Sequence, residues 1–193
     1  MSAIISLILA YLLGSISGAL LISKIFGLPD PRTQGSGNAG ATNMLRMAGK
    51  KIAIFVLLID FFKGLLAVWI GIIFGCSNLM LGFIAFAVVL GHVFPVFFQF
   101  KGGKGVATAL GALFGLSLWV GLLVLAVWLL VAYFTRYSSL SSLVAATLAP
   151  IFILFSSHAV FFFGAVLITA LIIYKHLGNI ERLRNGTEGK ISS

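Results

Sequence analysis

The amino-acid sequence predicts an all-α, polytopic integral membrane protein with about seven transmembrane helices, one of them short. Of its 193 residues, 61% are hydrophobic and only 9% are charged, and the mean hydropathy is +1.17. Several apolar runs approach the roughly 20 residues that a helix needs to cross a bilayer, and short polar breaks separate them. A soluble domain of this length does not need so much apolar surface. We therefore expect residues 1–193 to form one membrane-embedded domain.

The balance of charged residues limits the classes of partner that we expect for this protein. Thirteen Lys and Arg residues against four Asp and Glu residues give a net charge of +9. In a soluble protein this excess would suggest nucleic acid, but in a membrane protein it indicates span orientation and anionic ligands or lipid head groups. We therefore expect no nucleic-acid partner. The single cysteine, Cys76, excludes an internal disulfide and fits no metal site, and His92 and His158 are expected to be structural. We expect no metal and no cofactor.

The N-terminal half contains three predicted spans. The first covers about residues 3–26, and the second, about residues 51–75, carries Asp60 and Lys63 within it. Charges inside a span are costly, so this pair is either functional or a self-neutralising pair that fixes helix packing. The third span ends near Phe100.

The C-terminal half holds four further apolar runs, at about residues 106–114, 118–134, 143–155 and 159–174. The first of them is too short for a full crossing unless neighbouring protein covers its ends. If the first two runs and the last two runs each formed one long tilted helix, the chain would have five spans instead of seven.

The distribution of positive charge predicts the orientation. With seven helices, the polar segments at 27–50, 101–105 and 136–142 and the tail after residue 174 lie on one side, together with every positive charge except Lys63. Positively charged loops of membrane proteins stay in the cytoplasm, so we expect a cytoplasmic C-terminus and an N-terminus outside. With five helices, only the third of these segments would change sides.

The first polar segment contains a glycine-rich motif, GSGNAGATNMLR, at residues 35–46. It is not a dinucleotide-binding fingerprint, because that motif follows a β-strand and here a membrane helix precedes it. Its glycines still free the backbone to wrap around an anion, unless the segment is only a tight polar turn. The side chains that can bind an anion there are Ser36, Asn38, Thr42, Asn43 and Arg46. The arginine offers a planar fork for two phosphate oxygens.

A second glycine-rich motif, GHVFPVFFQFKGGKGVAT at residues 91–108, lies between two apolar runs. Three glycines surround Lys104, so backbone N–H groups and an ammonium can close on an anion at the start of the next helix. They are Gly102, Gly103 and Gly105. The motif lacks the Ser or Thr of a Walker A loop, so ATP is not the predicted ligand. The alternative is a basic loop that serves only to orient the protein.

The tail after the last apolar run carries a third motif, in which His176, Asn179 and Arg182 recur at three-residue steps. On a continuing helix they share one face at the membrane surface, either as a site or as an ordinary polar helix end. Glu181 lies on another side of such a helix, so a His–Glu dyad would need a break at Gly178.

The three motifs together resemble those of the bacterial acyl-phosphate:glycerol-3-phosphate acyltransferases, the PlsY family. The segments GSGNAGATN, GHVFPVFFQFKGGKGVAT and H-x-x-N-I-x-R-L-x-x-G-T-E occur in that order and reach from residue 35 to residue 188. The resemblance implies transfer of a fatty acyl group from acyl phosphate to the 1-hydroxyl of sn-glycerol 3-phosphate, giving lysophosphatidic acid and phosphate, the first acylation in phospholipid synthesis. It also implies an acyltransferase domain in the bacterial inner membrane with a cytoplasmic active site. The expected partners are glycerol 3-phosphate, a long-chain acyl phosphate and membrane lipids.

The resemblance further implies roles for individual residues. It assigns catalysis to Lys104, His176 and Asn179. It assigns substrate binding to Ser36, Arg46, Gly102, Gly103 and Gly105. We predict that the substrate-binding residues also include Gly37, Asn38, Thr42, Asn43, Ser142 and Arg182. The sequence has no His-x4-Asp pair and no plausible nucleophile, so we expect direct attack, with the leaving phosphate able to accept the proton. We expect His176 to position glycerol 3-phosphate by hydrogen bonding.

Two rival functions start from the same residues. A transporter for organic phosphates would want its ligand near the bilayer midplane and often carries an internal repeat, whereas this chain concentrates charge at one surface and shows no repeat. A structural membrane subunit would give no reason for basic, glycine-flanked residues in three places.

Overall fold

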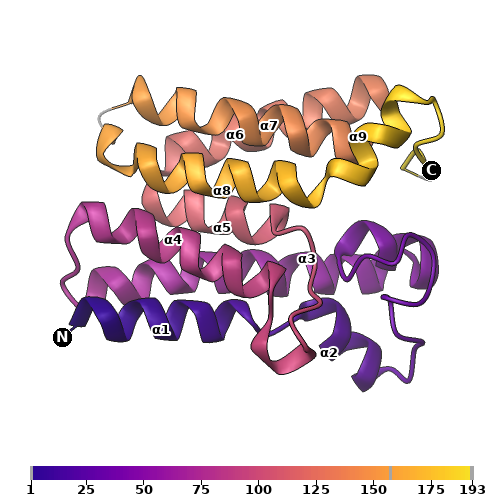
Figure 1. Cartoon of the computed structure of the whole chain (residues 1–193), viewed down its shortest axis with the longest axis horizontal. Coiled ribbons are helices and arrows are strands. Elements are labelled where there is room, and N and C mark those ends of the chain that lie inside the picture. The colour runs from indigo at the N-terminus through magenta and orange to yellow at the C-terminus, as the bar shows by residue number, and fades with distance from the viewer. Residues whose placement is uncertain (1, 157, 192–193) are drawn as a thin grey trace.

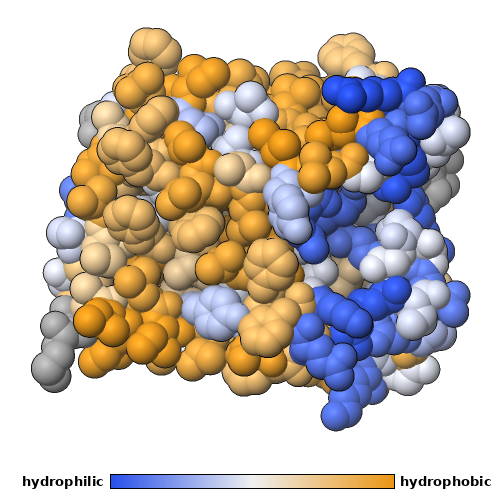
Figure 2. Space-filling view, viewed as in Figure 1, coloured by the Kyte–Doolittle hydropathy of each residue, from blue (hydrophilic) through white to orange (hydrophobic). Residues whose placement is uncertain are grey.

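The computed structural model describes residues 2–156 and 158–191, and all regular secondary structure in these ranges is helical, with no strand. The long helices lie along the long axis of the molecule (Figure 1). Large apolar side chains are exposed on the flanks of this bundle, and hydrophilic residues gather at one end (Figure 2). The prediction of an all-helical protein with several apolar helices is confirmed.

The helices follow one another along the chain with short connections. They are α1 (Ser2–Gly14), α2 (Gly18–Ile25), α3 (Ala41–Ile73), α4 (Asn78–Val93), η1 (Val96–Phe98), α5 (Val106–Leu116), α6 (Leu118–Thr135), α7 (Ser138–Leu154), η2 (Ala159–Phe161), α8 (Phe162–Lys175) and α9 (Leu177–Arg184). Among the described residues, α3, α4 with η1, and α6 are each long and apolar enough to cross a bilayer, and the bent pairs α1–α2 and α8–α9 pass the same test as pairs. α5 and α7 are shorter apolar helices. The number of crossings therefore stays a prediction.

The first predicted span consists of two helices and not one. α1 ends at Gly14 and α2 begins at Gly18, and the two helices are bent by 46° relative to each other. The break has a local cause, because the Ser17 hydroxyl accepts a hydrogen bond from the amide of Leu20 and so caps α2. Hydropathy could not predict this bend, since both helices are apolar.

The polar segment 27–50 contains helical residues that hydropathy alone does not predict. α3 begins at Ala41, and its backbone leaves the helical conformation at Gly49 (φ 81°, ψ 179°) before the predicted second span. Glycine adopts this φ without steric cost, so Gly49 lets a short helical segment join the span through a kink. Arg46 of the first motif lies on this short segment.

The two long helices of the five-span alternative do not form. α5 and α6 are separated at Ser117, whose extended backbone (φ −160°) ends one helix and starts the next, and α7 and α8 are separated as well. The hydroxyls of Thr42 and Ser138 lie 3.1 Å apart. The start of α7 therefore lies beside the first polar segment, as the seven-helix arrangement requires.

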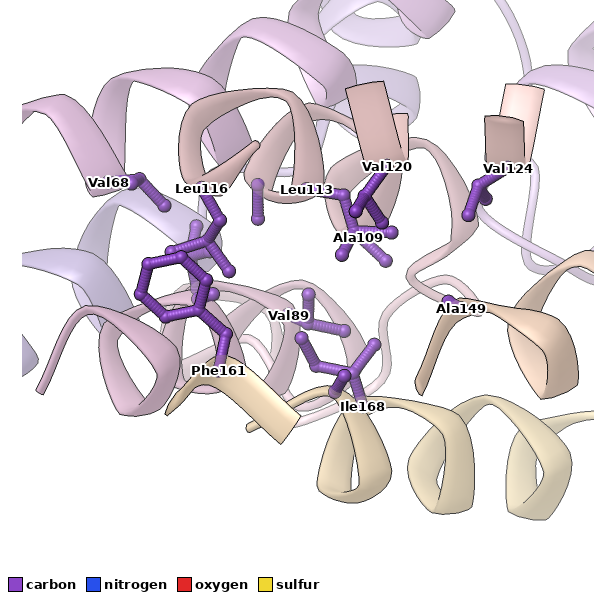
Figure 3. Close-up of a cluster of buried hydrophobic side chains, with 14 of the residues drawn as sticks. Val68, Val89, Ala109, Leu113, Leu116, Val120, Val124, Ala149, Phe161 and Ile168 are labelled. Atoms are coloured by element: carbon purple, nitrogen blue, oxygen red, sulfur yellow. The ribbon is translucent and has the colours of Figure 1, made fainter. Parts of the chain in front are cut away.

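Close contacts between the helices depend on glycines within the spans. A Cβ atom at Gly111 would collide with the carbonyl of Phe61, and one at Gly91 would collide with the carbonyl of Tyr11. The backbones of α5 and α3, and of α4 and α1, therefore approach closely, as helices in membranes commonly do. Small and branched apolar side chains fill the interior where α4, α5, α6, α7 and α8 meet (Figure 3).

Candidate functional site

Four polar segments meet at the hydrophilic end of the bundle, where α9 and the tail lie (Figures 1 and 2). They are the segment before α3, the loop between α4 and α5, the start of α7, and the tail after α9. Side chains join them: the Lys104 ammonium donates to Oδ1 of Asn179, and the Ser139 hydroxyl donates to Oε1 of Glu188 at 2.6 Å. Residues far apart in the sequence thus form one site.

The loop between α4 and α5, residues 101–105, is called here the KGGKG loop and is seated on the end of α4. The amide of Gly102 donates to the carbonyl of Val93, and the amide of Gly103 donates to the carbonyl of His92, both at 3.2 Å. These two amides already have partners within the protein. The two glycines therefore serve to bring the loop close to α4.

The second half of the KGGKG loop keeps the features that favour anion binding. The amides of Lys104 and Gly105 have no hydrogen-bond partner in the described part of the chain. Gly105 has a φ of 83°, which favours glycine, and directly precedes the first turn of α5. The positive end of the α5 dipole therefore lies at the same place as the lysine.

Lys104 is the partly buried cation of this loop. Burial lowers the pKa of its ammonium to about 8. The carboxylate of Glu188 opposes this shift of the pKa, whereas the positive charges of Arg182, Lys175 and Arg46 add to it. These four cations and one carboxylate act on one another within a single cluster, which leaves excess positive charge for anionic ligands.

Glu188 organises this cluster, although no sequence pattern assigned it a role of its own. Its side chain is only 8% exposed. It accepts hydrogen bonds from Ser139 and from Nδ2 of Asn179, each at 2.6 Å, and from Nε of Arg182 at 2.8 Å. Burial alone would raise the pKa of Glu188, but these hydrogen bonds hold that pKa below its ordinary value, so the group is a carboxylate at neutral pH. Its place at the end of the third motif is the signal that could have found it.

Asn179 lies between Glu188 and Lys104 and forms a hydrogen bond with each of them. Because Nδ2 of Asn179 donates to the carboxylate, Oδ1 is turned toward the ammonium and accepts from it. Asn179 is itself buried, at 7% exposure. The amide therefore orients the lysine instead of facing solvent.

His176 lies at the break between α8 and α9, where the chain bends by 57°. Its Nδ1 lies 2.8 Å from the carbonyl oxygen of Ile172. A carbonyl only accepts, so Nδ1 donates and the neutral ring carries its lone pair on Nε2. Burial, reinforced by the Lys104 ammonium, lowers the pKa of His176 to about 4. The break falls at His176 and not at Gly178, and no hydrogen bond joins Glu181 to His176 in the described structure.

The first glycine-rich motif folds around Asn43. Its Oδ1 accepts from the amide of Ser36 at 2.8 Å, and its Nδ2 donates to the carbonyls of Pro31 and Gln34 at 2.9 and 3.0 Å. Asn43 is 1% exposed and therefore shapes this loop from within. The Ser36 hydroxyl and the Asn38 side chain have no hydrogen-bond partner in the described ranges, so they can reach a ligand.

Arg46 faces the tail. Its Nη2 donates to the carbonyls of Gly189 and Lys190 at 3.0 and 3.1 Å. The residue is exposed, and its other guanidinium nitrogens have no hydrogen-bond partner among the residues described. Arg46 and the tail therefore close one side of the site while leaving donors for an anion.

An apolar cleft lies between α5, α6, α7 and α8. It begins at Val106, directly after the KGGKG loop, and Leu113 and Ile168 are among the residues that line it. Ser142 belongs to its wall, where its hydroxyl donates to the carbonyl of Ser138 at 2.7 Å and accepts from Nε1 of Trp128 at 3.1 Å. Ser142 thus lies in the wall of the cleft, where its hydroxyl is hydrogen-bonded within the protein.

No set of three His, Cys, Asp or Glu side chains in the described ranges could hold a metal ion.

The Glycerol-3-phosphate acyltransferase family matches residues 4–186 of the sequence. The chain belongs to the glycerol-3-phosphate acyltransferase family.

Relatives and solved structures of this family match almost the whole chain. The glycerol-3-phosphate acyltransferase of Coxiella burnetii (strain RSA 493 / Nine Mile phase I) is 52% identical over 191 residues, covering 99% of each chain. That of Pasteurella multocida (strain Pm70) is 48% identical over 189 residues, covering 98% of this chain and 94% of the relative.

A crystal structure of PlsY, an integral membrane glycerol 3-phosphate acyltransferase, in its glycerol 3-phosphate form, is similar at a TM-score of 0.94 with 46% identity. The match covers 100% of this chain and 96% of that one. The predicted PlsY family is confirmed, and the protein is a multi-pass membrane acyltransferase.

The pKa of Lys104 predicts the alkaline side of the pH–rate profile of this acyltransferase. The ammonium is present below about pH 8 and is lost as the pH rises above it. Glu188→Gln keeps the shape of the side chain but removes the charge that raises this pKa, so the alkaline limb should move to lower pH. The measurement is kcat/KM against pH, which reports ionisations of the free enzyme, for the wild type, Glu188→Gln and the exposed control Glu181→Gln. A limb that moves equally in both variants, or in neither, would contradict this coupling.

Proposed function

We propose that this acyltransferase moves a fatty acyl group from acyl phosphate to the 1-hydroxyl of sn-glycerol 3-phosphate. The products are lysophosphatidic acid and inorganic phosphate. The observation that carries the proposal is the placement of two basic groups at one end of an otherwise apolar bundle. Arg46 lies on the short helical segment that follows the first glycine-rich loop, and Lys104 lies in the KGGKG loop. The similar PlsY crystal structure, which is the glycerol 3-phosphate form of that enzyme, supports the proposed acceptor.

The charges support a reaction between two phosphate-bearing substrates. The charges that act on Lys104 are those of Arg46, Lys175 and Arg182 and of one carboxylate, that of Glu188. Two phosphate groups would neutralise the remaining positive charge, and each loop offers its own donors: the side chains of the first motif and the open amides of the KGGKG loop. Cations placed in advance around the reacting groups favour the transition state more than they would in water.

The apolar cleft supports a long acyl chain as the group that is transferred. It starts at Val106, next to the KGGKG loop, and continues between helices whose other faces are apolar. An acyl phosphate bound with its phosphate at the loop would lay its chain along this cleft and its carbonyl carbon near Lys104. The burial of the alkyl chain would contribute about 0.8 kcal/mol per methylene group.

The mechanism that fits these residues is direct, substrate-assisted attack. The glycerol hydroxyl oxygen bonds to the acyl carbonyl carbon, the bond from that carbon to the phosphate oxygen breaks, and a phosphate oxygen takes the hydroxyl proton. His176 presents a lone pair at Nε2, so it accepts a hydrogen bond from glycerol 3-phosphate and orients it. No covalent intermediate with the enzyme is required.

The rival functions have less support. A transporter and a structural subunit leave membership in an acyltransferase family unexplained. We propose further that residues 1–193 form one membrane-embedded acyltransferase domain of the bacterial inner membrane, with seven crossings, the N-terminus outside and the site in the cytoplasm. The segregation of positive charge supports this orientation.

Purified protein in detergent, supplied with acyl phosphate and glycerol 3-phosphate, should release phosphate and form lysophosphatidic acid. Lys104→Ala should lower kcat/KM about a hundredfold or more, because one pre-organised charge contributes on the order of 3 kcal/mol. Arg46→Lys should also lower kcat/KM, since an ammonium cannot replace the two parallel hydrogen bonds of a guanidinium. Product formed only from acyl-coenzyme A or acyl carrier protein thioesters would refute the proposed donor. Near wild-type turnover by Lys104→Ala would refute the role of the loop.

The proposed orientation predicts which positions react with a thiol reagent that cannot cross the membrane. Thr33 is exposed on the first polar segment, so Thr33→Cys in a Cys76→Ala background should be protected in intact cells and labelled after permeabilisation. Native Cys76 lies at the opposite end, and its labelling from outside serves as the matched comparison. Labelling of position 33 in intact cells would reverse the assignment.

The role of His176 can be separated from base catalysis. Its pKa of about 4 keeps the ring neutral above pH 5, so any acid limb near pH 6.5 should survive replacement of this residue. His176→Asn and His176→Gln each offer a carbonyl acceptor but cannot take the proton, and at least one of them should keep measurable activity. A general base contributes roughly 10² to 10⁴ in rate. If both variants bind glycerol 3-phosphate normally and have no activity, His176 is the base.

A further inference from the structure

A buried cluster of three ionisable side chains lies below the KGGKG loop and has no place in the mechanism above. Asp60 and Lys63 of α3 and His92 of α4 are 2%, 4% and 5% exposed. Charged groups inside a membrane domain are costly, and they persist where they have a function. The pairing of Asp60 with Lys63 was expected, whereas the sequence did not predict that His92 joins them.

Lys63 uses all three hydrogens of its ammonium within this cluster. Nζ donates to the carbonyl of Ile16 at 2.7 Å, to Oδ1 of Asp60 at 2.8 Å and to Nδ1 of His92 at 2.8 Å. Oδ1 of Asp60 also lies 3.3 Å from the amide of Gly18, which donates to it. The cluster therefore ties the break between α1 and α2 to α3 and α4.

These contacts fix the state of the His92 ring. An ammonium only donates, so Nδ1 accepts and the hydrogen of the neutral ring is on Nε2. The Thr108 hydroxyl lies 3.2 Å from the same Nδ1 and holds the ring from the side of α5. Nε2 has no hydrogen-bond partner in the described ranges. Lys63 and Thr108 thereby leave the ring one direction in which its N–H can point.

The Nε2–H of His92 points to the place where the two glycine-rich loops approach each other. A Cβ atom at Gly103 would collide with Nε2 of His92 and would lie 2.7 Å from the carbonyl oxygen of Ala39 in the first loop. The His92 carbonyl accepts from the amide of Gly103 as well. One residue of α4 thus contacts the KGGKG loop through both its backbone and its ring, at the point where the first loop approaches.

We propose that His92 is a positioning residue, held in one tautomer and one orientation by Lys63, that sets the spacing of the two loops and hence of the two phosphates. The proposal rests on the proposed function, in which each loop holds a phosphate. A self-neutralising Asp–Lys pair would not need a third polar group below the loops, and an apolar side chain would fill the same space without an N–H that lacks a partner. Misplacement of reacting groups by about 1 Å can lower a rate a hundredfold.

Two substitutions separate positioning from folding. His92→Asn keeps a carbonyl near the place of Nδ1, so it still accepts from Lys63, but its side chain is too short to reach Gly103. His92→Gln is longer and can place an N–H near the position of Nε2. His158→Asn, at the opposite end of the bundle, is the matched control for the loss of an imidazole.

The probe is inorganic phosphate, whose binding to the purified protein is followed by the rise in melting temperature on titration. We expect His92→Asn to weaken this binding about tenfold, to raise the KM for both substrates and to lower kcat by about a hundredfold. His92→Gln should recover most of the phosphate binding. His158→Asn should bind phosphate and turn over as the wild type does. Without phosphate, both His92 variants should melt within a few degrees of the wild type.

Other outcomes would overturn the proposal. KM and the affinity for phosphate do not depend on the folded fraction, so wild-type values in His92→Asn would reduce His92 to a packing role. The same conclusion follows if Asn and Gln are equally defective, or if neither gives folded protein. Phosphate binding needs no acyl donor, so a wild type that binds phosphate but does not use acyl phosphate would count against the proposed function alone.

Discussion

The site depends on a chain of hydrogen bonds that starts at the carboxylate of Glu188. This group turns the amide of Asn179, and the amide in turn receives the ammonium of Lys104. The same carboxylate binds Ser139 at the start of α7 and Arg182 on α9. This one carboxylate thus holds, directly or through Asn179, groups from three other parts of the chain: the KGGKG loop, the start of α7, and α9. Without it, the amide of Asn179 would be free to turn and Lys104 would lose its fixed acceptor.

The cluster has more positive than negative charge, and this imbalance is part of its design. Burial and neighbouring cations lower the pKa of Lys104, which means that the free protein is held under electrostatic strain at this end. In the proposed function, phosphate groups would relieve that strain because they would supply the missing negative charge. The same side chains would then provide both the affinity for the substrates and the repulsion in their absence. The apolar bundle supplies the rigidity that keeps these cations together.

The sequence predicted much of the arrangement because hydropathy and motifs are local signals. The apolar runs became helices, and the three motifs met at one end of the bundle. The bend after Gly14 was missed, because it depends on a cap at Ser17 inside an apolar run. Asn43 was expected to bind substrate, yet its amide holds the backbone of its own loop. Glu188 stands at the end of the third motif, but its role depends on a contact across 49 residues to Ser139, which hydropathy and local spacing do not encode.

The order of synthesis gives the tail a further consequence. Residues 185–191 follow every helix of the described structure, and a growing chain emerges with its N-terminal helices first. The apolar helices can therefore enter the bilayer before Glu188 has been made, and the cations of the earlier segments lack their shared carboxylate until that moment. A chain that is still being translated therefore lacks the group that orients Asn179 and Lys104. For the same reason, a cut between α9 and Glu188 would remove this carboxylate while leaving every described helix in the chain.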